Sequence, residues 1–228
     1  MDYQEFKECL KTYDTLYRQG LKKQANLCIA SLVKEVQMLN DVSKDTILYQ
    51  FTQGLCDADV FEFLRNRGNG DVPFALKTCL GEWLYARCLK KRMPELRWFY
   101  EVFRQDKCVG AEALEFLKEA YRSEKCDEKT VKLLFAAYLE TLEWGAHHFP
   151  DGCIITLQTK EAAFQKCRSI AEERKVDCRL QAQLTYFEIL YSCYDHCVSD
   201  GDKKKFHQYC KEADSEFYES KAYFYSEG

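Results

Sequence analysis

Hydrophobic side chains return at every third or fourth position through most of this chain, which is the spacing of one face of an α-helix. The first such stripe consists of Phe6, Leu10, Tyr13 and Tyr17, and charged residues lie between these positions. Gly20 ends this helix, and a second helix is predicted over residues 21–39. Its apolar face is expected to be formed by Leu27, Ala30, Val33 and Leu39.

Capping residues and glycines mark the next helix boundaries. Ser43 is suited to cap a third helix that runs to about Arg67, after which residues 68–70 (Gly-Asn-Gly) form a loop. Asp71, which precedes a Val-Pro pair, is suited to cap a fourth helix that runs to about Lys91.

Prolines and further caps divide the middle of the chain. Because proline disfavours helical geometry at the residue before it, Pro94 separates the fourth helix from a short fifth one. Gly110 precedes a sixth helix, and Asp127 can cap a seventh. The Phe-Pro-Asp-Gly sequence at residues 149–152 predicts a turn. Residues 154–157 are read as extended chain or the start of a helix, since one short strand without a partner is not stable.

Three closing helices complete the expected architecture, over residues 159–175, 177–198 and 202–224. About ten helices with connections of roughly 2–6 residues place sequence neighbours antiparallel to one another. We therefore expect an all-α fold, either an α-solenoid or a compact helical-repeat domain. The composition does not shift along the chain, so a single domain is predicted over residues 1–228, with a bend near 149–153.

Two family resemblances accompany this pattern. Ala162-Ala163-Phe164, followed by Ile170-Ala171, resembles the small-residue pattern in the second helix of a tetratricopeptide repeat. The repeat length of roughly 30–40 residues per helix pair is similar to that family as well. The resemblance implies a stack of helical hairpins with a concave surface that binds peptides. The full Trp-Leu-Gly-Tyr consensus of the family is not present.

The order of the last helices, with Arg179-Leu180 and residues 186–190 (Tyr-Phe-Glu-Ile-Leu), is similar to the 14-3-3 family. That resemblance implies phosphopeptide binding through basic residues on the third helix and an Arg-Tyr pair on the fifth. The corresponding positions here are Gln53, Asp59, Val60, Leu142 and Glu143. Acids at such positions would repel phosphate, so the phosphopeptide activity does not transfer.

Charge and composition narrow the possible environments and partners. The net charge of −4 gives no overall field that attracts nucleic acid or an anionic membrane. No apolar run is long enough to span a bilayer, and the acidic N-terminal residues do not resemble a signal peptide. A cytoplasmic protein is expected, with no nucleic-acid or membrane partner.

Cysteine is unusually frequent, with 13 residues spread almost evenly along the chain. The odd count and the lack of Cys-x-x-Cys argue against a disulfide framework, so reduced, buried thiols are expected.

One group has the chemistry of a zinc ligand set: Cys193 and Cys197 lie one turn apart, and a reversal at Gly201 would bring His207 and Cys210 near them. A metal- or thiol-dependent protein is therefore the alternative function.

No phosphate loop, nucleophile elbow or metalloprotease motif is present, so neither an enzyme nor a cofactor is predicted. One segment, Lys77 to Lys107, holds eight basic residues against four acidic ones, with aromatic residues between them. Arginine and aromatic side chains are enriched at interface hot spots. The candidate partner-binding residues are Trp83, Arg87, Lys90, Lys91, Arg92, Arg97, Trp98 and Tyr100. The predicted function is a scaffold that binds a protein or an acidic peptide; a simpler reading is that the cations complement a helix dipole.

Overall fold

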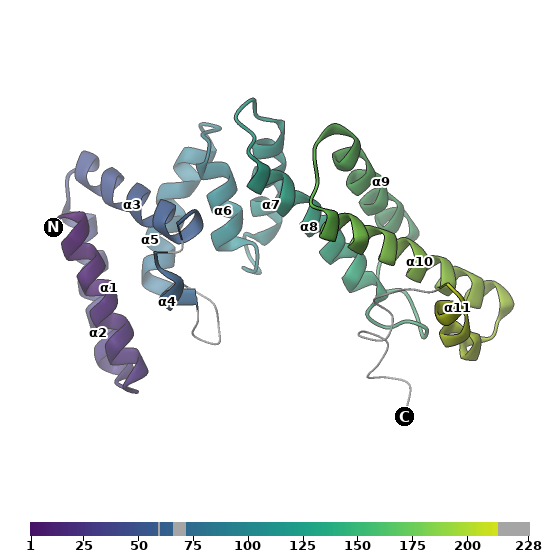
Figure 1. The fold of residues 1–228 in the computed structure, drawn as a ribbon. Helices are drawn as coiled ribbons and strands as arrows, with labels where there is room; N and C mark the ends of the chain where they lie inside the picture. Colours follow the sequence, from purple (N-terminus) through teal and green to yellow (C-terminus); the bar gives the residue numbers. More distant parts are fainter. Residues whose placement is uncertain (59, 66–71, 214–228) are drawn as a thin grey trace. The chain divides into compact units, whose positions relative to one another are not determined.

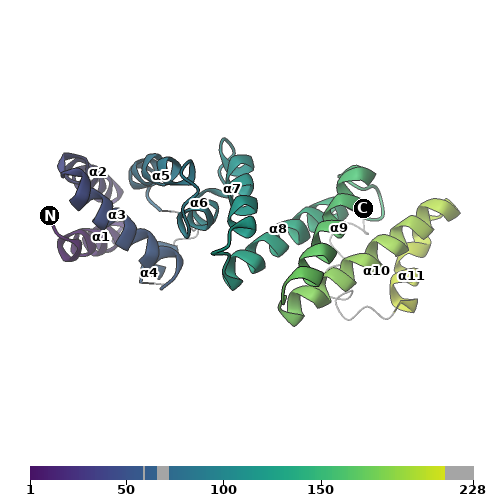
Figure 2. The same cartoon turned by 90° about the horizontal axis from the view of Figure 1, so that it is seen from above.

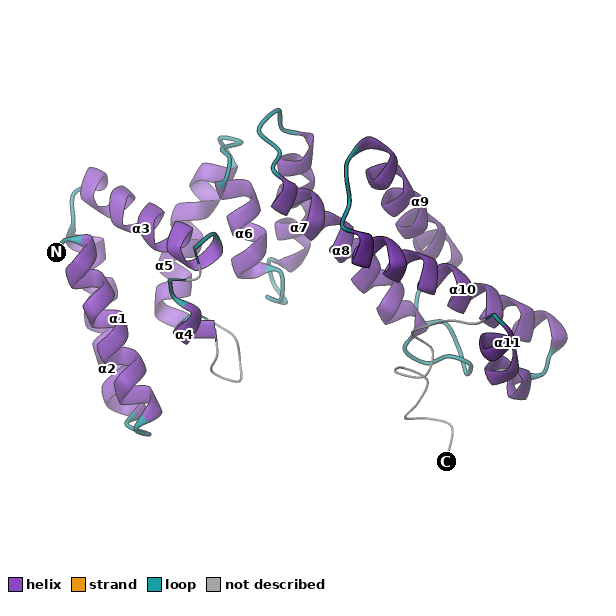
Figure 3. Ribbon diagram, in the orientation of Figure 1, coloured by secondary structure: helices purple, strands orange, loops and turns teal. Residues whose placement is uncertain are grey.

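A computed structural model describes residues 1–58, 60–65 and 72–213 (Figure 1). All regular secondary structure in these ranges is helical, which confirms the predicted all-α class (Figure 3). The chain forms two compact units, Met1–Lys125 and Cys126–Gly228. The predicted bend at residues 149–153 lies inside the second unit, and a single domain over the whole chain stays a prediction.

In the first unit, several helices that are consecutive in the chain pack against each other. α1 packs on α2, α5 on α6 and α6 on α7, and α2 also contacts α5 (Figure 1). Fully buried aromatic side chains, among them Phe6, Phe51 and Trp98, fill the core between these helices. The helices of this unit are α1 (Tyr3–Arg18), α2 (Lys22–Met38), α3 (Asp41–Cys56), α4 (Glu62–Arg65), α5 (Phe74–Cys88), α6 (Glu95–Phe103) and α7 (Gly110–Arg122).

In the second unit, α8 packs on α9, and α10 contacts both of them while α11 lies on α10 (Figure 2). The centre of this unit is aromatic: the ring of Tyr191 contacts Phe149 and Phe164 at 5.0 and 5.5 Å between ring centroids. The Tyr191 hydroxyl donates a 2.9 Å hydrogen bond to the carbonyl of Leu142. The elements of this unit are α8 (Glu128–Ala146), α9 (Leu157–Glu173), α10 (Cys178–Asp200), a 3₁₀ turn (Lys203–Lys205) and α11 (Phe206–Glu212).

Local capping explains most helix starts. Asp127 caps α8 as predicted, with its carboxylate accepting a 2.7 Å hydrogen bond from the Thr130 amide. The predicted cap of the third helix is wrong by three residues. Asn40 caps α3, and the Ser43 amide donates to its side chain at 2.9 Å. Ser43 therefore lies in the first turn, because asparagine caps a helix at least as well as serine.

The buried face of α2 differs from the predicted one. Leu27 and Ala30 are exposed, and Leu27 leaves 63% of its surface accessible. The helix instead buries Ala25, Ile29, Leu32, Val33 and Val36. Both sets of residues have helical spacing, so periodicity alone does not distinguish them. The packing of α2 against α1 and α5 decides which face is covered.

The third predicted helix is interrupted. α3 ends at Cys56, and the short α4 follows it. Phe61 and Leu64, which the sequence predicts to lie in the core, are nevertheless both buried. Residues 154–156 precede α9 without forming a strand, and Leu157 is the first residue of that helix. Asp59, the 68–70 loop, the Asp71 cap and the part of the last helix beyond residue 213 lie outside the described residues. Within the described residues, no helix combines the length and the apolar character needed to cross a bilayer.

Candidate partner-binding surface

The exposed cations of the predicted surface lie in the turn that ends α5. Lys91 adopts a left-handed conformation with φ of 51°, and its amide donates to the carbonyl of Cys88 at 2.8 Å. The amide of Arg92 reaches back to the carbonyl of Arg87 at 3.3 Å. These two bonds form a Schellman motif, which turns the chain sharply at the end of a helix. Lys90, Lys91 and Arg92 are therefore exposed together on one turn.

Arg87 connects three helices from the last turn of α5. Its guanidinium donates to the carboxylate of Glu95 on α6 at 3.0 Å, and it forms a short ion pair with Asp45 on α3. The guanidinium also lies over the ring of Trp83, 4.6 Å from its centroid. Trp83 donates from its indole nitrogen to Asp45 at 2.9 Å. Arg87 and Trp83 thus hold α5 against α3, and Arg87 also holds it against α6. The charge of Arg87 is already balanced by the carboxylates of Asp45 and Glu95.

Asp45 is ionised at neutral pH in this arrangement. Partial burial has the largest single effect and raises the pKa of its carboxyl group, whereas the hydrogen bonds from Arg87 and Trp83 lower it. The positive charges of Arg87 and Arg92 add to the lowering, so the Asp45 pKa lies below its usual value. The carboxylate therefore remains a fixed anchor for Arg87 and Trp83.

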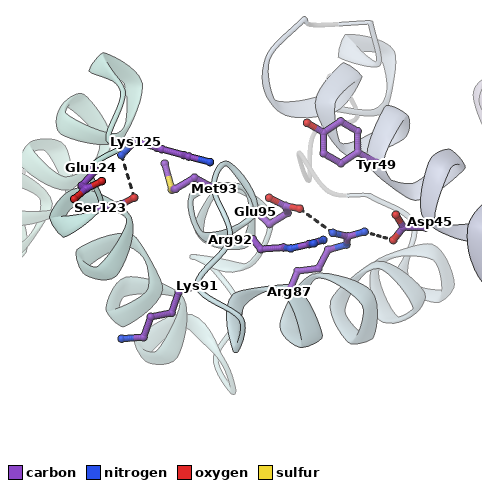
Figure 4. A pocket seen from close by; sticks show the side chains of 10 residues that line it. All are labelled: Asp45, Tyr49, Arg87, Lys91, Arg92, Met93, Glu95, Ser123, Glu124 and Lys125. Atoms are coloured by element: carbon purple, nitrogen blue, oxygen red, sulfur yellow. Dashed lines mark hydrogen bonds and ion pairs between the residues drawn. The ribbon is translucent and has the colours of Figure 1, made fainter.

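These residues border a hollow of about 560 Å³ in the first unit, which Figure 4 shows from close by. Four cations and three acids line it, and two of the acids already pair with Arg87. Lys91 forms a 3.1 Å ion pair with Glu119. In the described part of the chain, the side chains of Arg92 and Lys125 form no ion pair, and neither does that of Glu124, so these three side chains leave a net positive charge at the hollow. The lining residues are Asp45, Tyr49, Arg87, Lys91, Arg92, Met93, Glu95, Ser123, Glu124 and Lys125.

Three of the predicted partner-binding residues do not lie on the surface. Arg97, Trp98 and Tyr100 keep only 3%, 0% and 4% of their surface accessible. Arg97 donates to Asp57 at 2.8 Å and pairs with Glu101, and the indole of Trp98 donates to the other oxygen of Asp57 at 2.8 Å. The prediction that these three residues contact a partner is therefore corrected.

The physical reason is the position of α6. This helix packs against α5, α7 and α3, so seven of its nine residues are buried, including Glu95 and Arg97. Buried charges need partners, and Arg97 has Asp57 and Glu101 for this purpose. An interleaved Arg and aromatic pattern is common to a binding surface and to a core helix with a buried ion pair. The sequence does not separate the two cases.

Sequence reasoning also missed part of the hollow. Asp45 and Tyr49 come from α3, and Ser123 to Lys125 follow the end of α7. These segments are far apart in the chain, and no motif links them. Only the packing of α3 and the end of α7 beside the α5–α6 turn brings them together.

The four candidate zinc ligands of the second unit do not form a metal centre. Cys193 and Cys197 are buried on α10, Cys210 is buried on α11, and His207 is half-buried with its ring 6.0 Å from that of Phe206. Within the residues that the structure places, no group of three or more His, Cys, Asp or Glu side chains is arranged to hold a metal ion. The zinc alternative is thus not supported by the ligand geometry.

Comparison with known proteins provides no family for this chain. No protein-family model matches it, and neither the curated proteins nor the solved structures contain a match.

Proposed function

We propose that this protein is a non-catalytic helical scaffold that binds an acidic segment of a partner protein in the hollow beside Arg92 and Lys125. The observation that carries the proposal is that Arg92 and Lys125 have no carboxylate partner among the residues the structure describes, while both lie at the edge of an open hollow of about 560 Å³. Acidic side chains that enter there gain charge-assisted contacts with Arg92 and Lys125 without displacing an existing ion pair. Neighbouring Tyr49 and Met93 supply apolar contact area for the same segment.

The helix packing supports a repeat scaffold of the tetratricopeptide type. Neighbouring helices pair in both units, and helices also contact the next pair, as α2 does with α5 and α10 with α8. This is the packing expected of stacked hairpins, which create extended surfaces for peptides. The 14-3-3 resemblance adds no phosphopeptide site, because Val60, Leu142 and Glu143 carry no positive charge. A cytoplasmic location stays a prediction from the sequence.

The test uses the full chain and fluorescent peptides of equal length that are acidic, neutral or basic. Fluorescence anisotropy should show selective binding of the acidic peptides that weakens as salt rises. The double variant Arg92→Glu/Lys125→Glu should weaken this binding by about tenfold or more for each reversed charge.

The matched control is Lys11→Glu/Lys23→Glu, which changes the net charge equally on α1 and α2, away from the residues that line the hollow. This control should keep the acidic peptides bound within about twofold of the wild type. Equal weakening by both double variants, or equal binding of acidic and neutral peptides, would show that the hollow is not the binding site.

A further inference from the structure

Two hollows adjoin along one stripe of α10 in the second unit, where this helix contacts both α9 and α11 (Figure 1). A hollow of about 380 Å³ is lined by residues of α9 and α10, and another of about 610 Å³ by residues of α10 and α11. Glu188, Ser192 and His196 line both hollows. These residues are four positions apart, so they form one ridge along the helix. The ridge and its two hollows are called the α10 ridge surface below.

The floor of the α10 ridge surface is largely apolar. Phe164 and Tyr191 line the smaller hollow, and Ile189, Cys193 and Tyr209 line the larger one. Phe164, Tyr191 and Cys193 are buried, whereas Ile189 is half-buried. An apolar side chain of a partner gains binding free energy in such a hollow because it leaves water.

The lysine and the arginine that line this surface already have partners. The Nζ atom of Lys160 lies 2.9 Å from Oδ2 of Asp195 and 5.5 Å from the ring centroid of Tyr191. The guanidinium of Arg168 donates two hydrogen bonds, of 2.9 and 2.7 Å, to Oε1 of Glu188. Both ion pairs join α9 to α10, so these cations serve the packing of the unit and have little charge left for an anionic ligand.

Two carboxylates of the surface remain without a cation. Glu161 on α9 lines the smaller hollow, and Glu212 at the end of α11 lines the larger one. Within the described residues, neither forms an ion pair, and Glu212 accepts a 2.7 Å hydrogen bond from the neutral amide of Gln208. Three and four positions on either side of Glu161, no lysine or arginine is available within the helix. The surface therefore combines an apolar floor with unbalanced negative charge at both hollows.

We propose that the α10 ridge surface binds a basic amphipathic segment of a partner protein. Its apolar side chains enter the two hollows, and its lysine or arginine side chains pair with Glu161 and Glu212. The apolar contacts supply most of the affinity, because exposed ion pairs contribute little on their own. This inference concerns the second unit and is independent of the acidic-segment site in the first.

Charge complementarity selects this occupant over two others. Residues 214–228 of the same chain contain four acidic residues and one lysine, so their charge does not complement the two carboxylates. The phosphates of a nucleic acid would meet the same repulsion. A segment with lysine or arginine beside its apolar residues meets neither obstacle.

The test uses the full chain and a fluorescent peptide with leucine at every third or fourth position and lysine or arginine between them. Its anisotropy should rise on titration, and binding should weaken as salt increases. Two comparison peptides of equal length carry serine in place of leucine, or glutamine in place of the basic residues. Each should bind at least about tenfold more weakly, because one lacks the apolar contacts and the other lacks the charges.

Charge variants locate the site. Glu161→Lys/Glu212→Lys should weaken binding of the basic leucine peptide by about tenfold or more, and Glu161→Gln/Glu212→Gln should weaken it less. The matched control is Glu128→Lys/Glu172→Lys, which changes the net charge equally on α8 and α9 at residues that line neither hollow. This control should bind the peptide within about twofold of the wild type. Far-UV circular dichroism verifies that each variant keeps its helix content.

The two proposed sites are tested separately, since Arg92→Glu/Lys125→Glu in the first unit should leave binding of the basic leucine peptide within about twofold. Equal affinity for the glutamine peptide, or equal weakening by the Glu161/Glu212 reversal and its matched control, would overturn the assignment of the α10 ridge surface.

Discussion

Substituting Gly145 by alanine tests how tightly the second unit is packed. Gly145 lies in the last turn of α8 and is buried against α10 and the loop before α9. A Cβ atom there would overlap the hydroxyl oxygen of Tyr191 and lie 2.6 Å from Cγ1 and Cδ1 of Ile155. Helix propensity alone predicts the opposite result, because alanine in a helix interior is about 1 kcal/mol more favourable than glycine.

Tyr191 has little room to move away from the added methyl group. Its ring is held between Phe149 and Phe164, and its hydroxyl donates to the carbonyl of Leu142. Overpacking a core costs about 1–3 kcal/mol, and loss of this buried hydrogen bond costs about 1 kcal/mol more. After subtracting the propensity gain of about 1 kcal/mol, Gly145→Ala should lower the free energy of unfolding by about 1–3 kcal/mol.

The measurement is chemical denaturation of the full chain combined with hydrogen exchange. Faster exchange should appear in α8 and α10, since the clash lies between them. The control is Gly152→Ala in the loop before α9, where a Cβ atom meets nothing within 4 Å and the variant should be neutral or slightly more stable. The double variant Gly145→Ala/Tyr191→Phe should recover part of the loss, because it removes the overlapping oxygen. A Gly145→Ala protein as stable as the wild type would refute the reasoning.

Three further predictions concern the first unit. Lys91→Gly should be about 1 kcal/mol more stable than Lys91→Ala in urea denaturation, because both lose the Glu119 ion pair but only glycine relieves the left-handed φ of 51°. The lowered pKa of Asp45 contributes stability that is complete above the usual aspartate pKa and is lost as pH falls through the folded value. Asp45→Asn should therefore flatten the acid side of a stability profile measured from about pH 2 to pH 6; an unchanged slope would contradict this. Phe51→Ala should cost about 3–5 kcal/mol, whereas Phe74→Ala, at an 84% exposed position, should change the unfolding free energy by less than about 0.5 kcal/mol.

The amino-acid sequence by itself determined the helical class and many of the helix boundaries. Asp127 caps α8 through its own side chain, and Pro94 precedes α6, because these effects depend on a few adjacent residues. The apolar residues at helical spacing predicted most of the helices, because that spacing also depends only on nearby positions in the sequence. Where two local signals compete, as Asn40 and Ser43 do at the start of α3, the choice was wrong by less than one turn.

Only the tertiary structure decided which of these residues are accessible. Leu27 is exposed and Arg97 is buried, although the sequence pattern favours the reverse for both. Burial depends on which faces of neighbouring helices meet, and those contacts join residues that are far apart in the chain. A local pattern describes one helix at a time, so it specifies where an apolar stripe lies but not which other helix covers it.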